Sequence, residues 1–241
     1  MRPRFLVVRS GGRPFPADLA PALEVVDRAT HEIVALNPDP KILTGGFDLV
    51  IVTSQAAVEQ LVAREDLRSR LSGRLIAVGP ATAALLRAHV TAAVEDGGGS
   101  ARRILETLPA DLSGRRILLP RGEDATDELA RELARRGGNV VPLTLYRKVP
   151  RPYDAAVDAL VTGPGIAVFC ATSPSAARWL LKGAAPPARA VLQRTPAVTL
   201  GESTREELGR WGVVGVDIAE GPTFESAGRL ALSLAGNAPG A

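Results

Sequence analysis

Small hydroxyl residues recur in two parts of the chain, each where an apolar run gives way to a helix-like segment. Ser54, Thr82 and Ser100 are spaced by 28 and 18 residues, and Ser173, Thr204 and Thr223 by 31 and 19. At the junction of a strand and a helix, the first N–H groups of the helix are unpaired and its dipole is positive, which suits an anionic ligand. Serine and threonine are also ordinary N-caps, so each position alone has a structural explanation. Their duplication at matching places favours a binding site.

The surrounding sequence is duplicated as well, which ties these positions together. FDLVIVTSQAAVEQL (47–61) matches IAVFCATSPSAARWL (166–180), and LIAVGPATAALL (75–86) matches AVTLGESTREEL (197–208). A third pair, 90–108 and 213–234, follows in the same order. The second copy adds Ser175 and Gly201 to the candidate binding residues, because both stand at the expected start of a helix. An internal repeat of this kind predicts two domains of similar fold.

The partition that fits the repeat is an insertion, not two tandem halves. RRILLPRGEDATDELARELARRGGNVVPLTLY (115–146) resembles residues 5–36, and this alignment pairs Arg9 with Arg121. We therefore expect a discontinuous domain of residues 1–36 plus 150–241 and an inserted domain of residues 37–149. Prolines in both expected crossings, at 37–40 and 146–150, predict short extended connectors, with the ligand cleft between the domains.

Short apolar runs alternate with helix-length amphipathic segments, which predicts an α/β fold with parallel sheets flanked by helices. The inserted domain and its approaches should contain strands near 48–53, 75–79, 91–94, 115–120 and 139–146. The discontinuous domain should contain strands near 4–9, 31–36, 166–171, 197–200 and 214–218.

Composition excludes several classes of protein. One cysteine, Cys170, stands inside an apolar run, and there are only two histidines, His31 and His89, so neither a disulfide framework nor a metal cluster is expected. The net charge of +3 is spread among acidic residues without an aromatic platform, which argues against nucleic-acid binding. Gly-Pro-Gly and Ser-Pro interrupt the longest uncharged stretch, and the N-terminus lacks a signal-peptide pattern. We expect a cytoplasmic protein that does not enter a membrane.

Several segments resemble the uroporphyrinogen-III synthase family. The likeness runs from Phe5 to about Leu234, and the order of its motifs is more specific than any single one. It is carried by DLVIVTSQAAV (48–58), LIAVGPATAALL (75–86), GGGSARRILETL (97–108), RRILLPRGE (115–123), LTLYRKV (143–149), AVFCATSPSAAR (167–178) and TLGESTREELGRWGV (199–213).

The resemblance implies two similar α/β domains joined by a two-stranded connector, and a monomer. It implies conversion of hydroxymethylbilane, a linear tetrapyrrole, to uroporphyrinogen III with loss of water, inversion of ring D and closure of the macrocycle, without cofactor or metal. Tyr146 falls where the family's connector tyrosine does, and is the candidate catalytic residue that helps the hydroxyl leave. Arg9 and Arg121 are candidate contacts of the substrate's carboxylates. A transient handover from hydroxymethylbilane synthase would follow.

Two positions depart from the family pattern, and one other class of function stays open. Gln55 stands where proline or asparagine is frequent after Thr-Ser, and Glu202 stands where proline or a neutral residue is commoner. Either could alter contacts with the substrate. The alternative interpretation is a cytoplasmic two-domain binding protein or sensor for an anionic small molecule.

Overall fold

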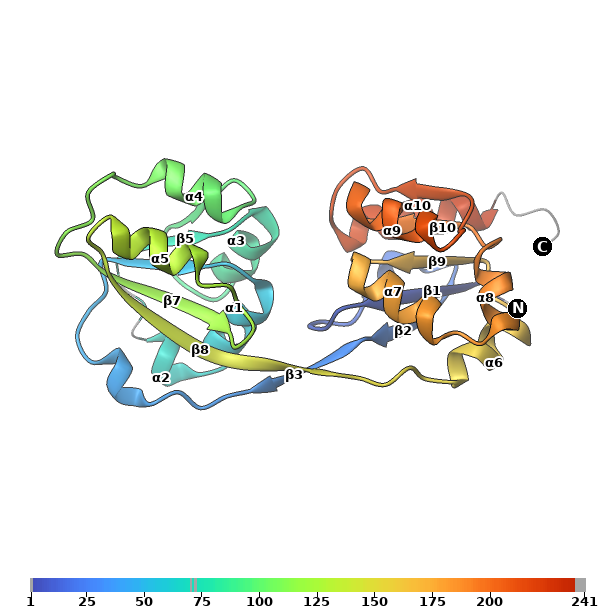
Figure 1. The fold of residues 1–241 in the computed structure, drawn as a ribbon, viewed down its shortest axis with the longest axis horizontal. Helices are drawn as coiled ribbons and strands as arrows, with labels where there is room; N and C mark the ends of the chain where they lie inside the picture. The colour runs from blue at the N-terminus through green and yellow to red at the C-terminus, as the bar shows by residue number, and fades with distance from the viewer. Residues whose placement is uncertain (1, 70, 72, 237–241) are drawn as a thin grey trace. The chain divides into compact units, whose positions relative to one another are not determined.

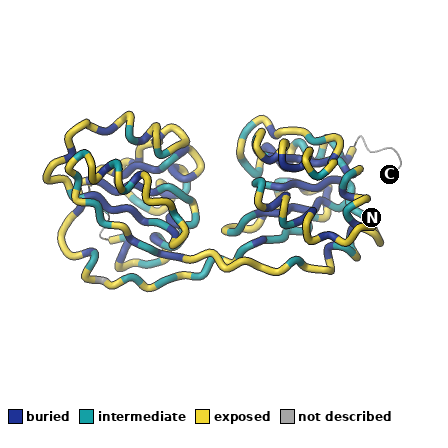
Figure 2. Tube along the Cα trace, in the orientation of Figure 1, coloured by how far each residue is buried: buried dark blue, intermediate teal, exposed yellow. Residues whose placement is uncertain are grey.

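The computed structural model describes residues 2–69, 71 and 73–236, and these fall into two compact units (Figure 1). The discontinuous unit comprises Met1–Glu32 and Pro150–Ala241, and the inserted unit comprises Ile33–Val149. These boundaries describe how the residues pack together. The domain boundaries expected from the repeat, residues 1–36 plus 150–241 and residues 37–149, stay a prediction. In each unit the most buried segments are the strands at its centre (Figure 2).

The inserted unit is built on a six-stranded sheet with the order β3-β8-β7-β4-β5-β6. From β8 to β6 every neighbouring pair is parallel, so these strands end at the same edge. The strands are β3 (His31–Ala35), β4 (Leu49–Val52), β5 (Arg74–Ala77), β6 (Val94–Asp96), β7 (Arg116–Gly122) and β8 (Asn139–Pro150).

The discontinuous unit has a five-stranded sheet with the order β11-β10-β9-β1-β2, and all of its neighbouring pairs are parallel. Its strands are β1 (Arg4–Arg9), β2 (Glu24–Ala29), β9 (Val168–Ala171), β10 (Ala197–Thr199) and β11 (Val216–Ile218). Reading β2-β1-β9-β10-β11 beside β8-β7-β4-β5-β6 gives the same strand order twice. The chain enters the two orders at different points, because β1 and β2 precede β9 whereas β7 and β8 follow β6. The parallel α/β architecture expected from the sequence is confirmed, and the repeat is a repeat of topology.

One strand was missed and one lies elsewhere than expected. The partner of β1 is β2, Glu24–Ala29, which was not among the predicted strands. Its sequence EVVDRA carries few apolar residues, because a strand at the edge of a sheet need not be buried on both faces. The strand expected at 31–36 is β3, and it lies beside β8 in the sheet of the inserted unit. The strand expected at 91–94 begins only at Val94.

β3 and β8 carry the chain across the boundary between the units. The boundary falls at Glu32/Ile33 within β3 and at Val149/Pro150 within β8. The first crossing therefore lies before residues 37–40, where the prolines had predicted it. Pro40 instead begins a short 3-10 helix, Pro40–Leu43. Two neighbouring strands form the connector that the resemblance implied.

Helices cover both faces of each sheet, and the alternation of strand side chains explains why. In β4, Val50 and Val52 join one apolar cluster with α1 and α3, whereas Leu49 and Ile51 join another with α4 and α5. In β1, the same alternation divides the side chains between a cluster with α6 to α9 and a cluster with α10. The helices are α1 (Gln55–Val62), α2 (Glu65–Arg68), α3 (Pro80–Arg87), α4 (Ala101–Thr107), α5 (Glu128–Arg135), α6 (Ala156–Thr162), α7 (Pro174–Gly183), α8 (Pro186–Leu192), α9 (Glu202–Arg210) and α10 (Phe224–Gly236).

Candidate functional site

The predicted site residues of each unit gather at the carboxyl edge of its sheet. In the inserted unit Ser54 follows β4, Thr82 follows β5 and Ser100 follows β6. Arg121 lies near the end of β7, and Tyr146 lies within β8. The discontinuous unit repeats this edge with six residues: Arg9, Ser173, Ser175, Gly201, Thr204 and Thr223. Ligands of open parallel sheets bind at this edge, because loops and helix N-termini converge there.

Ser54 is both a helix cap and the partner of Tyr146. Its Oγ accepts the Ala57 N–H at 3.1 Å, which caps α1, and lies 3.1 Å from the Tyr146 hydroxyl oxygen. Tyr146 is only 3 % exposed, whereas Ser54 is half-buried. A ligand at this edge would therefore meet Ser54 before it meets the tyrosine.

Thr82 and Thr204 occupy matching places in the two units, but neither is a cap. Each is the third residue of its helix, after Gly79 and Gly201 at the N-cap positions. The threonines are 6 % and 3 % exposed. An added Cβ at Gly201 would meet no atom within 4 Å, so this turn is open on its outer side. The glycines leave the first N–H groups of α3 and α9 without a side-chain cap, which is the arrangement that an anion could complete.

Ser100 and Thr223 differ in how tightly they are held. Ser100 is exposed and caps α4 by accepting the Arg103 N–H at 3.2 Å. Thr223 is half-buried, accepts the Ser226 N–H at 3.2 Å and lies 3.1 Å from the Ser226 Oγ. Both therefore act as caps, and substrate binding by them stays a prediction.

Three serine hydroxyls meet at the start of α7. Ser173 caps the helix by accepting the Ala176 N–H at 3.2 Å, and its Oγ lies 2.8 Å from Ser10 Oγ and 3.0 Å from Ser175 Oγ. Ser10 was not predicted. Ser10 follows Arg9 as Gly122 follows Arg121, so the repeat aligns Ser10 with a glycine. Because glycine has no hydroxyl, the comparison of the two copies did not indicate Ser10 as a site residue.

Arg9 and Arg121 organise the loops that follow their strands. Arg9 donates to both oxygens of Asp27 at 2.9 Å from Nε and to the Gly12 carbonyl at 2.7 Å. Arg121 donates from Nη1 to Asp127 at 2.7 Å and from Nη2 to the Ala125 carbonyl. Their side chains are 10 % and 13 % exposed. Both guanidinium groups are thus largely buried and already bonded within the protein, and direct binding of a carboxylate stays a prediction for both.

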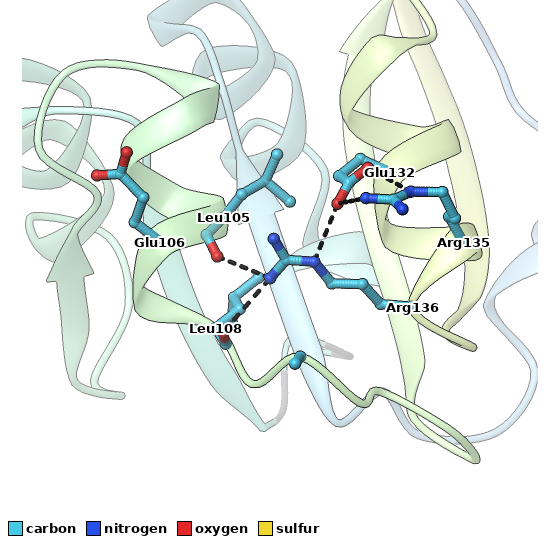
Figure 3. Close-up of a pocket in the computed structure, with 7 residues that line it drawn as sticks. Leu105, Glu106, Leu108, Glu132, Arg135 and Arg136 are labelled. Atoms are coloured by element: carbon cyan, nitrogen blue, oxygen red, sulfur yellow. Dashed lines mark hydrogen bonds and ion pairs between the residues drawn. The ribbon is translucent and has the colours of Figure 1, made fainter.

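Two hollows flank these elements. One, of about 330 Å³, lies beside the carboxyl ends of β1 and β2 and is lined by Arg9, Asp27, Arg28, Ala29, Arg151, Pro152, Asp154 and Trp179. The other lies between the C-terminal parts of α4 and α5, where Arg136 bonds to Glu132 and to the Leu105 carbonyl (Figure 3). Because these helices start at the carboxyl edge, the second hollow is at their far ends. It is separate from the predicted site.

Few groups in the described part of the chain have the character of a reactive acid or ligand. Burial raises the pKa of the Cys170 thiol to about 12, so it is a core residue and not a nucleophile. Burial, with a hydrogen bond to Asp158, raises the pKa of Tyr153 above its ordinary value. Among the described residues, His, Cys, Asp and Glu side chains form no group that could hold a metal ion. None of the described helices has the length and apolar character needed to span a bilayer.

Known proteins share both the fold and the sequence pattern. The family model for uroporphyrinogen-III synthase HemD matches residues 9–227. A protein of Methanothermobacter thermautotrophicus assigned as a uroporphyrinogen-III synthase is 31% identical over 245 aligned positions, covering 95% of this chain and 92% of its own.

Two crystal structures show the same fold. A mutant uroporphyrinogen III synthase of Thermus thermophilus superposes with a TM-score of 0.59 at 24% identity, covering 95% of this chain and 99% of its own. The uroporphyrinogen-III synthetase of Helicobacter pylori gives a TM-score of 0.60 at 21% identity, covering 97% and 100%. The family match spans both units and reaches every predicted site residue. This chain belongs to the uroporphyrinogen-III synthase family.

Proposed function

We propose that this protein is a uroporphyrinogen-III synthase, a cyclising lyase that converts hydroxymethylbilane to uroporphyrinogen III in tetrapyrrole biosynthesis. The observation that carries the proposal is the family match over residues 9–227, which includes the carboxyl edges of both sheets. The substrate is a linear tetrapyrrole rich in carboxylates. Helix N-termini lined by small residues suit such a ligand, because their N–H groups can bind anions without a cationic side chain.

The reaction needs a leaving group and a bent substrate more than it needs a strong acid. Loss of the terminal hydroxyl gives an electron-deficient azafulvene that the pyrrole itself stabilises. The substituted carbon of ring D then attacks, and the spiro intermediate fragments and recloses with ring D inverted. The hydroxyl departs as water, and the proton it takes up is balanced by the one released when the pyrrole regains aromaticity. Holding the chain in the bent geometry therefore supplies most of the acceleration.

Tyr146 assists departure of the hydroxyl through Ser54. Ser54 Oγ accepts the Ala57 N–H, and either hydroxyl can donate in its contact with Tyr146. In the proposed mechanism Tyr146 donates, which leaves the Ser54 O–H free to donate to the leaving group. The 3 % exposure of Tyr146 favours this route over direct contact. Ser54 is also proposed to bind a substrate carboxylate at the start of α1. The same role at each edge is proposed for the other residues: Arg9, Thr82, Ser100, Arg121, Ser173, Ser175, Gly201, Thr204 and Thr223.

Location and supply of substrate form part of the same proposal. Hydroxymethylbilane closes spontaneously to the type I isomer, so rapid transfer from hydroxymethylbilane synthase would limit the loss of substrate. We place the reaction in the cytoplasm, where a chain with one buried cysteine has no need of disulfides.

Analysis of the product isomers tests the proposal directly. The purified protein is given hydroxymethylbilane made freshly by hydroxymethylbilane synthase, and the oxidised porphyrins are separated by chromatography. We expect the type III isomer to dominate. Production of the type I isomer alone would reject the synthase and leave the binding protein as the alternative.

The variant Tyr146→Phe tests the residue's role in the same assay. Removing the hydroxyl should lower kcat by roughly tenfold to a thousandfold, which is below the ~10²–10⁴-fold of a direct general acid because Tyr146 acts through Ser54. Its apolar ring keeps the packing, so the thermal unfolding curve serves as the control for folding. A wild-type kcat would remove Tyr146 from the mechanism.

A further inference from the structure

The position of the Tyr146 ring depends on an irregularity in β8. Residues Arg121 and Thr144 are partners across β7 and β8, but the next pair is Gly122 and Tyr146, so Leu145 is an extra residue in a β-bulge. Successive side chains of a regular strand point to opposite faces. Here Leu145 and Tyr146 are both buried, at 1 % and 3 % exposure, and both belong to the same apolar cluster. The bulge thus turns the tyrosine to the face on which Ser54 lies.

Gly122 supplies the space that the turned ring occupies. A Cβ at this position would lie 2.8 Å from Cε2 and Cζ of Tyr146 and 2.9 Å from an oxygen of Asp124. The Asp124 carboxylate is exposed and can move aside. The ring cannot move as easily, because it is packed in the core, and ordinary contact with a Cβ begins only at 3.4 Å. Cζ carries the hydroxyl, so displacing it displaces the oxygen that contacts Ser54.

The discontinuous unit shows the same scaffold without the tyrosine. There the residue that matches Gly122 is Ser10, and its Oγ lies 2.8 Å from Ser173, the counterpart of Ser54. The pair Arg9 and Ala29 matches the pair Arg121 and Thr144, so counting two residues onward makes His31 the counterpart of Tyr146 in sequence. The Nδ1 of His31 lies near Thr30 Oγ1 and the Ser10 carbonyl. The capping serine of each unit therefore has a hydroxyl partner, from Ser10 in one unit and from Tyr146 in the other. A side chain at position 122 would compete with the tyrosine for that place.

We propose that Gly122 is a positioning residue, which together with the bulge at Leu145 holds the Tyr146 hydroxyl against Ser54. The functional consequence rests on the proposed synthase activity, whereas the placement of the tyrosine can be measured without it. Gly122 itself offers no group to the substrate. Its effect on turnover passes through Tyr146.

The test compares Gly122→Ala, Tyr146→Phe and the double variant in the isomer assay. Gly209→Ala is the matched control, because a Cβ at Gly209 meets no atom within 4 Å and that residue is exposed. We expect Gly122→Ala to lower kcat tenfold or more, with KM changed less than threefold, and Gly209→Ala to leave both unchanged. In the Tyr146→Phe background, adding Gly122→Ala should cause no further loss. A multiplicative loss in the double variant, or a wild-type kcat in Gly122→Ala, would overturn the proposal.

A spectroscopic measurement separates this proposal from the proposed function. With 3-fluorotyrosine incorporated, the two tyrosines give ¹⁹F resonances that Tyr146→Phe assigns. Gly122→Ala should shift the Tyr146 resonance and leave that of Tyr153 in place, even if the wild-type protein makes no type III isomer. An unmoved Tyr146 resonance would contradict the proposal. If Gly122→Ala does not fold, the double variant with Tyr146→Leu should fold, because leucine lacks the two ring atoms that clash with the added Cβ. A double variant that also fails to fold would contradict the proposal.

Discussion

Replacing Ser54 separates helix capping from substrate binding, because two substitutions change these properties differently. Ser54→Ala removes the bond to the Ala57 N–H and the contact with Tyr146. Losing a serine cap costs about 1 kcal/mol, and losing a neutral hydrogen bond costs ~0.5–1.5 kcal/mol more. We therefore expect the free energy of unfolding to fall by roughly 1.5–2.5 kcal/mol. Ser54→Asp keeps a capping oxygen and adds a charge that the helix dipole favours, so its unfolding free energy should stay within about 0.5 kcal/mol of wild type.

Both variants should lose activity, but through different kinetic parameters. An aspartate at position 54 places a negative charge where the substrate's carboxylates are proposed to bind, and like charges brought together weaken binding. We expect KM for hydroxymethylbilane to rise about tenfold or more in Ser54→Asp, since each factor of ten corresponds to about 1.4 kcal/mol. Ser54→Ala should mainly lower kcat, because the link from Tyr146 to the leaving hydroxyl is lost.

The assays combine urea unfolding with steady-state kinetics. Far-UV circular dichroism follows both units, whereas the two tryptophans, Trp179 and Trp211, both lie in the discontinuous unit and report on it alone. Ser100→Ala is the matched control for the unfolding measurement alone, because it removes a cap without a second hydroxyl partner among the described contacts. It should cost about 1 kcal/mol. A wild-type KM in a stable Ser54→Asp protein would refute the placement of the anion site at α1.

Two further predictions concern groups that are not candidate site residues. Hydrogen bonds from the Arg116 N–H and the Arg115 guanidinium hold the pKa of Asp48 below its ordinary value of 3.8. The stabilisation by the Asp48 carboxylate is thus complete above pH 3.8 and is lost as pH falls through the lower pKa of the folded state. Asp48→Asn should therefore destabilise the protein at pH 7 and cease to do so in strong acid. Urea unfolding at a series of pH values measures the difference in unfolding free energy, and a difference that does not change with pH would contradict the prediction. Burial raises the pKa of the Cys170 thiol to about 12, so a disulfide reagent at pH 8 should modify it only after unfolding, and rapid labelling of the native protein would show that this strand opens.

The parallel α/β architecture could be predicted from the sequence, because each strand and the helix that follows it are marked by local sequence patterns. Apolar runs such as LVIV at Leu49–Val52 and VFCA at Val168–Ala171 are buried on both faces, and they stand directly before helix starts. The repeat then placed equivalent strands in equivalent positions. The edge strand β2 escaped prediction for the opposite reason, since EVVDRA has only two adjacent valines among three charged residues and none of its residues is fully buried.

The contacts at the candidate site were harder to predict, because a change of one residue in register carries no compositional signal. Nothing in LTLYRKV distinguishes a regular strand from one with an extra residue at Leu145, yet a regular strand would point Tyr146 away from Ser54. Ser10 was missed for a related reason, since the repeat aligns it with a glycine. The two differences belong together: where the residue after the arginine has a hydroxyl, it reaches the capping serine itself, and where it is glycine, a tyrosine from the next strand takes its place. The duplicated scaffold thus accommodates a tyrosine at one of its two edges. Under the proposed mechanism, this asymmetry places the departure of the hydroxyl at the inserted unit.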